Sequence, residues 1–487
     1  MIFLNAKRGT HGVEAWVGPD SPIPNVRGIR SDVVAALKQL QVPNVRWPGG
    51  CYADNYHWRE GIGPARRERV NVNWGGSIEP NTFGTHEFMD FVEQIGSEAY
   101  LTLNVGSGTV QEASDWLEYM TTDKPTALGQ ERRANGHAAP WRIKYLGIGN
   151  ESWGCGGGMS ADAYVERMKS FATLAQNVHP EQFGNPMKIN PNDSQRIAVG
   201  QGLGETAYTS ALMKAWQSRK FPQFWQMNGI SLHHYSWIGR MPMADSSTDF
   251  GANEYARLIK RAYLMDAMIV EHDAIMNQYD PEKKVAIVVD EWGAWLKPEP
   301  GRNPLFLRQQ NTLRDAIMAS ITLNTFARHA ERVRMSNIAQ MINVIQAMIL
   351  TDGPKMVLTP TYHVYKMYLP FHDAQVIPLK IDAGVYREGE VDIPRIDAIS
   401  AKAKDGSIWV ALTNLDPAAA QRIALDVKGM PVASATGQQL TAPKVNSFNT
   451  FDSPDTVHPQ NVQIKGQGQT ITLTVPPKSV TVLRLTQ

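Results

Sequence analysis

Two glutamates stand at the ends of apolar segments that have the composition of β-strands. Glu151 follows Asn150 at the end of "IKYLGIGNE" (143–151), and Glu291 follows Asp290 in "VAIVVDEWG" (285–293). Two carboxyl groups on either side of a glycosidic bond can hydrolyse it, because one protonates the leaving oxygen while the other attacks the anomeric carbon or activates water. This chemistry requires a fold that brings the two strand ends together.

The other polar residues at strand ends have simpler interpretations. Asp290 is expected to hold a neighbouring loop or an arginine. The segment "NGISLHHY" (228–235) ends in His233, His234 and Tyr235. Adjacent side chains of a strand point to opposite faces, so at most one of these histidines faces a common site. Metal sites at strand ends usually draw their ligands from more than one strand, and the chain has no His-x-His. We therefore expect no metal ion and no other cofactor.

The segments that must position these residues alternate between strands and helices over the first three quarters of the chain. Apolar runs predict strands at 42–50, 99–106, 143–151, 196–201, 228–235 and 285–293, and helical periodicity lies between them, as at 31–41, 161–178 and 255–279. Ser31 is the expected N-cap of the first of these helices. Buried strands each followed by a helix indicate an α/β fold with a parallel sheet, for which the (βα)8 TIM barrel is the leading architecture. A doubly wound sheet is second, but no strand is followed by G-x-G-x-x-G.

The pattern changes from about residue 370. Segments such as "SIWVALTNLD" and "QTITLTVPPKSVTVLRL" alternate apolar and polar residues and contain turn signals, which indicates a C-terminal antiparallel β-sandwich. The stretch 433–462, rich in Ser, Thr, Asn and Pro, is expected to be a long loop. The apolar stretch 335–350 is interpreted as a buried helix.

Composition excludes several classes of function. The 487 residues suffice for about two domains, and a net charge of +1 gives no reason to expect a nucleic-acid partner. No apolar run approaches the ~18 residues of a membrane span, and the N-terminus shows no signal peptide, so a cytoplasmic protein is expected. Cys51 and Cys155 are the only cysteines and do not make a disulfide framework, in weak agreement with a reducing compartment.

Several motifs, in order along the chain, resemble those of the α-L-arabinofuranosidases of glycoside hydrolase family 51. They include "RWPGGCYADNYHWREGIGPARR", "GIGNESWGCGG", "SLHHYS", "VVDEWGAW" and "NIAQMINVIQAMILTDG". The resemblance implies a catalytic barrel (13–369), a β-sandwich (370–487) and an N-terminal strand (1–12) that joins the sandwich. It also implies a retaining double displacement that releases terminal arabinofuranosyl groups from oligo- or polysaccharides, and a homo-oligomer such as a hexamer.

The resemblance also assigns roles to residues. Glu151 corresponds to the general acid/base and Glu291 to the nucleophile, which Tyr235 positions. Asn150 corresponds to the amide that binds the sugar 2-hydroxyl. The remaining residues expected to bind substrate are Gln340, Cys51 and Trp292.

The resemblance fails near the N-terminus. Family members pass from an "AKRGT"-like strand through a segment containing "EHLGR" to "WVG", whereas "NAKRGTHGVEAWVG" goes almost directly from one to the other. The absent piece corresponds to the first barrel strand and an acidic residue that contacts the sugar, and Glu14 does not match it. We therefore expect a missing or replaced first strand, with weakened sugar binding or altered specificity.

Three alternatives follow from the residues alone. The first is another retaining glycosidase on the same scaffold, such as a β-xylosidase or an endo-glucanase, because the two-carboxylate chemistry is shared. The second is a carbohydrate-binding homologue whose catalysis is impaired by the N-terminal gap. The third, metal-dependent hydrolysis, predicts loss of activity on chelation.

Overall fold

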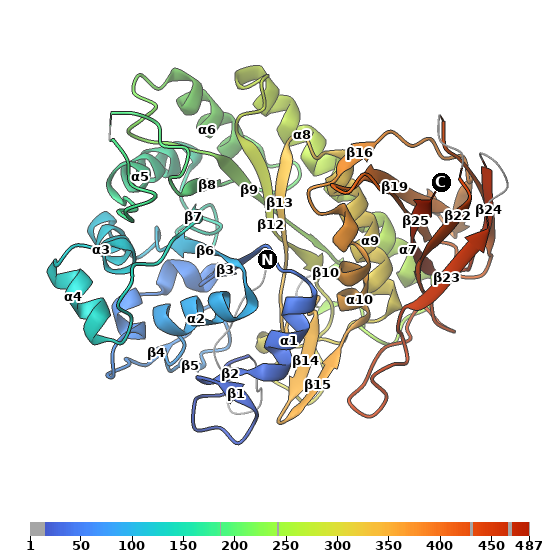
Figure 1. The fold of residues 1–487 in the computed structure, drawn as a ribbon, viewed down its shortest axis with the longest axis horizontal. Helices are drawn as coiled ribbons and strands as arrows, with labels where there is room; N and C mark the ends of the chain where they lie inside the picture. The colour runs from blue at the N-terminus through green and yellow to red at the C-terminus, as the bar shows by residue number, and fades with distance from the viewer. Residues whose placement is uncertain (1–14, 186, 241–242, 429–431, 466–469, 487) are drawn as a thin grey trace.

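Seven parallel strands form one nearly closed sheet around the centre of the larger lobe (Figure 1). The computed structural model describes residues 15–185, 187–240, 243–428, 432–465 and 470–486. Within them the strand order is β13-β12-β9-β8-β7-β6-β3. The bounds in chain order are β3 Asn44–Trp47, β6 Glu98–Leu103, β7 Tyr145–Ile148, β8 Gln195–Val199, β9 Gly229–Ser236, β12 Ala286–Ala294 and β13 Val333–Ile338.

Helices surround this sheet, and most of them bury apolar residues in a core shared with it (Figure 1). The strands are buried along almost their whole length, as expected for a sheet covered by helices. The helices are α1 Ser31–Gln39, α2 Thr85–Ile95, α3 Val110–Thr121, α4 Ala127–Ala134, α5 Ala161–Leu174, α6 Ala207–Ser218, α7 Ala252–Ala262, α8 Leu264–Tyr279, α9 Leu313–Arg328 and α10 Pro360–Met367. Within the described ranges, no helix has the length and apolar character that crossing a membrane requires.

The sheet has a seam between β3 and β13. An eight-stranded barrel would place its first strand there, and in the described part of the chain no strand pairs with either edge. This agrees with the expected missing first strand. The two edges are joined by side chains instead, because Asn337 Nδ2 donates to Asn44 Oδ1 over 2.7 Å. The N-terminal strand predicted at 1–12 lies outside the described residues.

Two antiparallel sheets form the second lobe, on the right in Figure 1. Apolar residues of both sheets, such as Leu412 and Leu483 on one and Leu473 on the other, form a core between them, which makes this lobe a β-sandwich. The larger sheet has the order β16-β19-β20-β25-β22-β23 and the smaller one pairs β21 with β24. Their bounds are β16 Gln375–Ile377, β19 Ile396–Lys402, β20 Ile408–Asn414, β21 Gln421–Asp426, β22 Ser434–Leu440, β23 Gln460–Lys465, β24 Thr470–Val475 and β25 Ser479–Thr486.

Short hairpins and 3₁₀ helices lie outside the seven-stranded sheet and the two sheets of the sandwich. The hairpins are β1 Asn25–Val26 with β2 Ile29–Arg30, β4 Arg69–Val70 with β5 Ile78–Glu79, β10 Gly239–Arg240 with β11 Met243–Ala244, β14 Ile349–Asp352 with β15 Lys355–Leu358, and β17 Val385–Glu388 with β18 Val391–Pro394. The 3₁₀ helices are η1 Cys51–Asn55, η2 Trp58–Gly61, η3 Pro304–Phe306 and η4 Leu369–Phe371.

Several predictions of local structure were wrong. The stretch 335–350 is not a helix: it contains most of β13, a loop and the start of β14, because apolar residues that are buried on all sides do not reveal their period. The helix predicted at 255–279 is two helices that meet at Tyr263. Ser31 is the first helical residue rather than the cap, and the loop predicted at 433–462 contains β22 and the start of β23.

Candidate active site

Glu151 and Glu291 meet at the mouth where the carboxyl ends of the barrel strands converge. Glu151 follows β7, and Glu291 lies in β12. One carboxylate oxygen of each, together with one ring nitrogen of His233 from β9, lie within 4.8 Å of one another. The barrel therefore brings together the two carboxyl groups whose pairing the sequence suggested, at the end of the fold where barrel enzymes bind substrate.

Glu291 is buried and held by two polar side chains. Tyr235 Oη donates to its Oε1 over 2.6 Å, and Arg46 Nη1 lies 3.5 Å from its Oε2. Burial raises the pKa of Glu291, as does the charge of Glu151, while His233, Arg46 and the Tyr235 hydrogen bond act in the opposite direction. The three polar neighbours thus favour the ionised carboxylate that a nucleophile must present.

His233 bridges the carboxylates of the site. Its Nδ1 lies 2.9 Å from Glu151 Oε1 and its Nε2 lies 3.1 Å from Asp290 Oδ1. Burial alone would lower the pKa of His233, but Glu291, Asp290 and Glu151 outweigh it and raise the pKa to about 10. His233 is therefore an imidazolium at neutral pH. His234 points to the opposite face, where its Nε2 lies 3.3 Å from the carbonyl oxygen of Arg261.

Asp290 holds an arginine, which is one of the two roles expected for it from the sequence. Arg46 Nε lies 3.2 Å from its Oδ2, and Tyr100 Oη donates to the same oxygen over 2.7 Å. Burial acts to raise the pKa of Asp290, but Arg46, His233 and Tyr100 together lower it to about 2. Asp290 therefore stays ionised and fixes Arg46 and His233 beneath the two catalytic candidates.

Asn150 and Glu151 adopt a tightly constrained turn. Arg46 Nη2 donates to Asn150 Oδ1 over 2.7 Å, so the amide nitrogen of Asn150, which has no partner among the described residues, remains as a donor for a ligand hydroxyl. Glu151 has a φ of 43°, in the left-handed region that residues with a Cβ seldom occupy. Its carbonyl oxygen accepts from the backbone N–H groups of Gly154 at 2.7 Å and Gly156 at 3.1 Å.

Cys51 and Cys155 form a disulfide, which corrects the expectation that the two cysteines make none and removes the weak support that they gave to a reducing compartment. They are 104 positions apart in sequence, yet their Cα atoms lie 5.5 Å apart because the loops after β3 and β7 meet at the mouth. Cys155 Sγ lies 3.4 Å and Cys51 Sγ 3.9 Å from Glu151 Oε2. Cys51 therefore lies beside the candidate acid/base, as a sulfur of the bond that joins the two loops.

A pocket with about 370 Å³ of empty space opens beside Glu291. Gln340 contributes a buried Oε1 that has no partner among the described residues, which suits it to bind a sugar hydroxyl. The rings of Trp74 and Trp295, whose centroids lie 6.3 Å apart, provide apolar walls of the kind that sugar rings pack against. The lining comprises Gly49, Gly50, Tyr52, Trp74, Tyr235, Glu291, Trp295, Leu307, Gln340, Val344 and Ile345.

Trp292, which the resemblance assigned to substrate binding, is not among the residues that line this pocket. It is 1% exposed and its ring packs edge-on against Phe326 of α9, with 5.5 Å between centroids. β12 is irregular here, with register shifts against both neighbouring strands, so that Asp290 and Glu291 both face His233 while Trp292 points toward α9. The aromatic residue that faces the pocket from this segment is Trp295.

Two groups of side chains near Glu151 have ligand atoms close enough to hold a cation. The first consists of Glu151, His233 and Glu291, but a histidine that is protonated between carboxylates cannot offer a lone pair. The second consists of Glu151 and the two cysteines, whose sulfurs are engaged in the disulfide. A cation at the first group would have to displace the proton of His233, and one at the second would meet sulfurs already bonded to each other.

Sequence reasoning missed the residues that act from below the site. Arg46, Tyr100 and His233 hold the carboxylates, although no motif gave them a role. The sequence held a signal for Arg46, because a charged residue inside a buried strand needs a partner. In the structure Arg46 lies within β3 and is 1% exposed. Trp74 and Trp295 gave no comparable signal among 13 tryptophans.

Comparison with known proteins agrees with this geometry. The family model of the α-L-arabinofuranosidase 1 domain matches residues 36–208, and that of the α-L-arabinofuranosidase C-terminal domain matches residues 290–479. An intracellular exo-α-L-arabinofuranosidase of Bacteroides ovatus is 41% identical over 475 residues, which cover 96% of this chain and 89% of that protein.

Solved structures show the same fold. The glycoside hydrolase family 51 arabinofuranosidase of Xanthomonas axonopodis pv. citri is 46% identical, with a TM-score of 0.91 and coverage of 97% of this chain and 93% of that one. The arabinose complex of the Thermotoga maritima α-L-arabinofuranosidase is 26% identical, with a TM-score of 0.80 and coverage of 97% and 94%.

A barrel that presents two carboxylates to each other across its mouth, with a sandwich beside it, is the architecture of a glycoside hydrolase. The identities above extend over nearly the full length of the compared chains. This chain belongs to the α-L-arabinofuranosidases of glycoside hydrolase family 51.

Proposed function

We propose that this enzyme releases terminal α-L-arabinofuranosyl groups from arabinose-containing oligo- or polysaccharides, with Glu291 as nucleophile and Glu151 as general acid/base. The observation that carries the assignment of roles is that one carboxylate oxygen of each glutamate lies within 4.8 Å of the other at one mouth. Retaining enzymes separate these groups by about 5–5.5 Å, whereas inverting enzymes leave roughly 6.5–9.5 Å for a water molecule.

The first step forms a glycosyl-enzyme ester. Tyr235 binds Oε1 of Glu291, so Oε2, which accepts no hydrogen bond from the described residues, is the oxygen that attacks the anomeric carbon. His233 Nδ1 faces Oε1 of Glu151, so Oε2 of Glu151 carries the proton that passes to the leaving oxygen. The C–O bond to the aglycone breaks as the bond to Glu291 forms.

The second step hydrolyses that ester. Glu151, now a carboxylate, takes a proton from water while the water oxygen attacks the anomeric carbon from the face that the aglycone left. Arabinose is released with its original configuration and Glu291 returns as a carboxylate. The free amide N–H of Asn150 supports the assignment of this residue to the 2-hydroxyl, a contact that strengthens in the transition state.

A substrate panel with product stereochemistry tests this function. The enzyme should hydrolyse 4-nitrophenyl α-L-arabinofuranoside at least tenfold faster than the β-D-xyloside or the β-D-glucoside. NMR of the first-formed sugar should show retained configuration. Preference for the xyloside or glucoside would support another retaining glycosidase, and sugar binding without any turnover would support an impaired homologue; either result would overturn the proposal.

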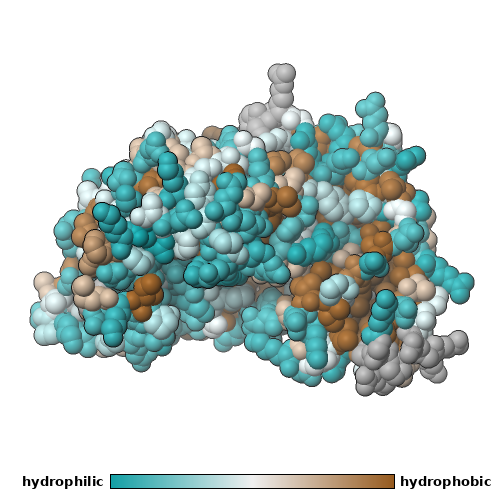
Figure 2. Space-filling model, turned by 90° about the horizontal axis from the view of Figure 1, so that it is seen from above, coloured by the Kyte–Doolittle hydropathy of each residue, from teal (hydrophilic) through white to brown (hydrophobic). Residues whose placement is uncertain are grey.

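We infer further that the enzyme works in the cytoplasm as a homo-oligomer such as a hexamer. The Bacteroides ovatus relative is named intracellular, which supports the location. Apolar side chains gather on the sandwich half of the face in Figure 2, and Ile381 and Val385 of that lobe are 41% and 44% exposed, which supports an association surface. Light scattering should give a multiple of 54.1 kDa, and a monomer would contradict the assembly.

A further inference from the structure

A buried carboxylate from η1 lies beneath the turn that carries Glu151. Asp54 is 2% exposed and accepts three backbone hydrogen bonds. Its Oδ1 accepts from the N–H groups of Val105 at 2.7 Å and Gly106 at 2.8 Å, and its Oδ2 accepts from the N–H of Asn150 at 2.9 Å. One side chain therefore joins three strand ends, those of β3, β6 and β7, at the floor of the mouth.

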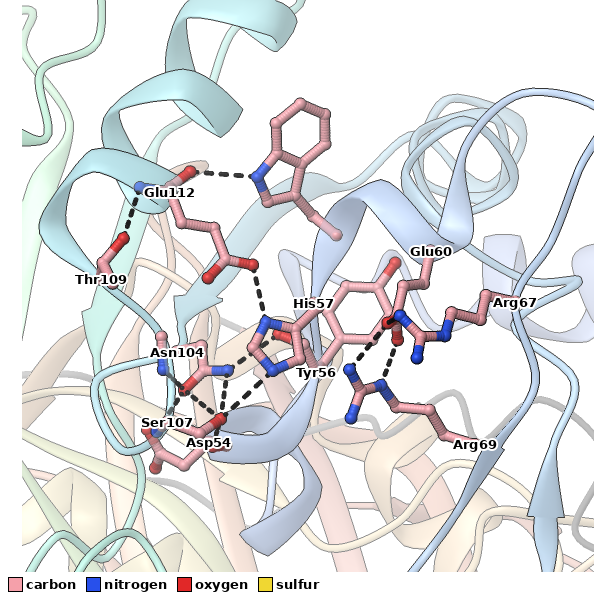
Figure 3. Close-up of polar contacts among 12 residues, drawn as sticks. Asp54, Tyr56, His57, Glu60, Arg67, Arg69, Asn104, Ser107, Thr109 and Glu112 are labelled. Carbon is pink, nitrogen blue, oxygen red and sulfur yellow. Dashed lines mark hydrogen bonds and ion pairs between the residues drawn. The ribbon is translucent and has the colours of Figure 1, made fainter.

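Asp54 is itself fixed by the loop after β6 (Figure 3). The backbone N–H of Ser107 donates to the carbonyl oxygen of Asp54 over 3.1 Å, and Ser107 Oγ donates to the same oxygen over 2.8 Å. The Ser107 hydroxyl also lies 3.5 Å from His57, which contacts Glu112 at 2.9 Å. This arrangement resembles a hydrolytic triad, but the hydroxyl proton is already committed to Asp54, so the group serves to hold η1.

The backbone packs closely around this carboxylate. A Cβ at Gly156 would lie 2.7 Å from Asp54 Oδ2 and 2.0 Å from the carbonyl oxygen of Asn150. A Cβ at Gly106 would lie 2.8 Å from Asp54 Cβ. Because real Cβ atoms do not approach so closely, both Gly106 and Gly156 require glycine on packing grounds.

The charge of Asp54 is suited to this role. Burial raises its pKa to about 6, against the three backbone N–H groups and the positive charge of Arg46, which favour the ionised form. At neutral pH the group is a carboxylate with acceptor lone pairs toward all three donors. An asparagine at this position could accept hydrogen bonds only at its amide oxygen, because its amide nitrogen is a donor.

Glu151, which follows Asn150, needs the support that Asp54 gives to the main chain. The left-handed backbone of Glu151 is strained for a residue with a Cβ and persists only where its surroundings fix it. Asp54 fixes the main chain immediately before it, and Gly154 and Gly156 hold its carbonyl oxygen from the other side. If the hydrogen bond from the N–H of Asn150 to Asp54 is lost, the main chain of Asn150 and Glu151 can relax. The carboxyl group of Glu151 then rotates away from the leaving oxygen.

We propose that Asp54 is a positioning residue for the general acid/base: by holding the main chain of Asn150, it keeps Glu151 in the conformation that presents its carboxyl group to the leaving oxygen. The inference rests on the roles proposed above for Glu151 and Glu291. It predicts a specific defect in proton transfer rather than a uniform loss of activity.

Asp54→Asn is the informative variant, because the amide keeps the volume and can still accept from Val105 and Gly106 while it turns an NH₂ toward the N–H of Asn150. Its kcat/KM should fall about 10–100-fold on an alkyl arabinofuranoside, whose leaving group needs the acid, and less than about threefold on the 4-nitrophenyl substrate, whose leaving group does not. Azide, which needs no general base, should accelerate turnover of the nitrophenyl substrate by the variant several-fold.

Asp280→Asn is the matched control. Asp280 is also 2% exposed and accepts a backbone N–H, that of Val285 at 2.8 Å, but before β12 and away from the mouth. It should lower thermal stability and leave the ratio of the two kcat/KM values unchanged. That ratio does not depend on the fraction of folded enzyme, so poor folding of Asp54→Asn cannot imitate the expected result.

An unchanged ratio in Asp54→Asn, without acceleration by azide, would overturn the inference. The proposed function would still stand in that case, since the wild-type enzyme would hydrolyse both arabinofuranosides. If the wild type hydrolysed neither substrate, the proposed function itself would fail.

Discussion

His233 Nδ1 lies 2.9 Å from Glu151 Oε1, so the candidate acid/base faces a cation rather than a neutral donor. The same imidazolium contacts Asp290, which makes it the centre of charge compensation in the site. The stability of the folded state therefore depends on the protonation of His233, and so does catalysis.

The stability of the enzyme should fall at alkaline pH as His233 loses its proton. Its pKa is raised from 6.5 to about 10 in the folded state, so its stabilising contribution is complete below about pH 6.5 and is lost as the pH rises through 10. Thermal melts from about pH 7 to about pH 11 should show this decline. His233→Gln should be less stable at pH 7 and show a smaller alkaline decline; a decline of equal size in the variant would exclude His233 as the cause.

Tyr235→Phe should weaken catalysis and shift its pH dependence. The lost hydrogen bond holds Glu291 in its ionised form, so removal raises the pKa of Glu291 and moves the acid limb of kcat/KM to higher pH. A hydrogen bond to a charged group is worth about 1.5–3 kcal/mol, which corresponds to roughly a 10–100-fold lower rate.

Tyr164→Phe provides the control for that shift. Tyr164 is fully buried, and its hydroxyl donates to the carbonyl oxygen of Ile148, 2.7 Å away, rather than to Glu291 or Glu151. The acid limb should stay in place in this variant. An unshifted limb in Tyr235→Phe would show that the hydroxyl does not tune Glu291.

The strands and the carboxylates at their ends could be predicted because each is encoded locally. A run such as 285–289 is apolar at every position, and Glu291 after it is conspicuous. Asp290 was expected to hold a neighbouring loop or an arginine, and the structure shows the arginine, because a buried carboxylate needs a cation.

Contacts between distant segments could not be predicted in the same way. Asp54 has no local feature that marks it as an acceptor of three N–H groups from two other loops. The disulfide depends on the convergence of loops after β3 and β7, which spacing in sequence does not reveal. The buried stretch after β13 was mistaken for a helix because its polar residues, such as Gln346, are satisfied by tertiary hydrogen bonds rather than by solvent.

Gln340 and Trp292 should respond differently to substitution, although the sequence suggested a sugar contact for both. Gln340→Ala removes a polar group from the pocket and should raise KM about tenfold with little change in the melting temperature. Trp292→Phe reduces packing against Phe326 in the core and should lower the melting temperature while KM stays within about twofold. A raised KM in Trp292→Phe would place this ring in the substrate site.

Reduction of the Cys51–Cys155 bond should destabilise the fold more than it impairs the site. Closing a loop of about 100 residues is worth roughly 4–5 kcal/mol in the chain-entropy description, so dithiothreitol should lower the melting temperature by several degrees. Activity should fall only a few-fold, because Asp54 still joins the same two loops. A double Cys→Ser variant should melt at the lower temperature with or without reductant; two titratable thiols in the untreated, denatured wild type would contradict the bond.

Chemical rescue of Glu291→Ala tests the central claim most directly. The variant should be at least about 10⁴-fold slower on 4-nitrophenyl α-L-arabinofuranoside, and azide should restore turnover by occupying the space of the missing carboxylate. The product should be the arabinofuranosyl azide of inverted configuration, since azide attacks from the face of the nucleophile. Near-normal activity of Glu291→Ala without azide, or a rescued product of retained configuration, would show that Glu291 is not the nucleophile.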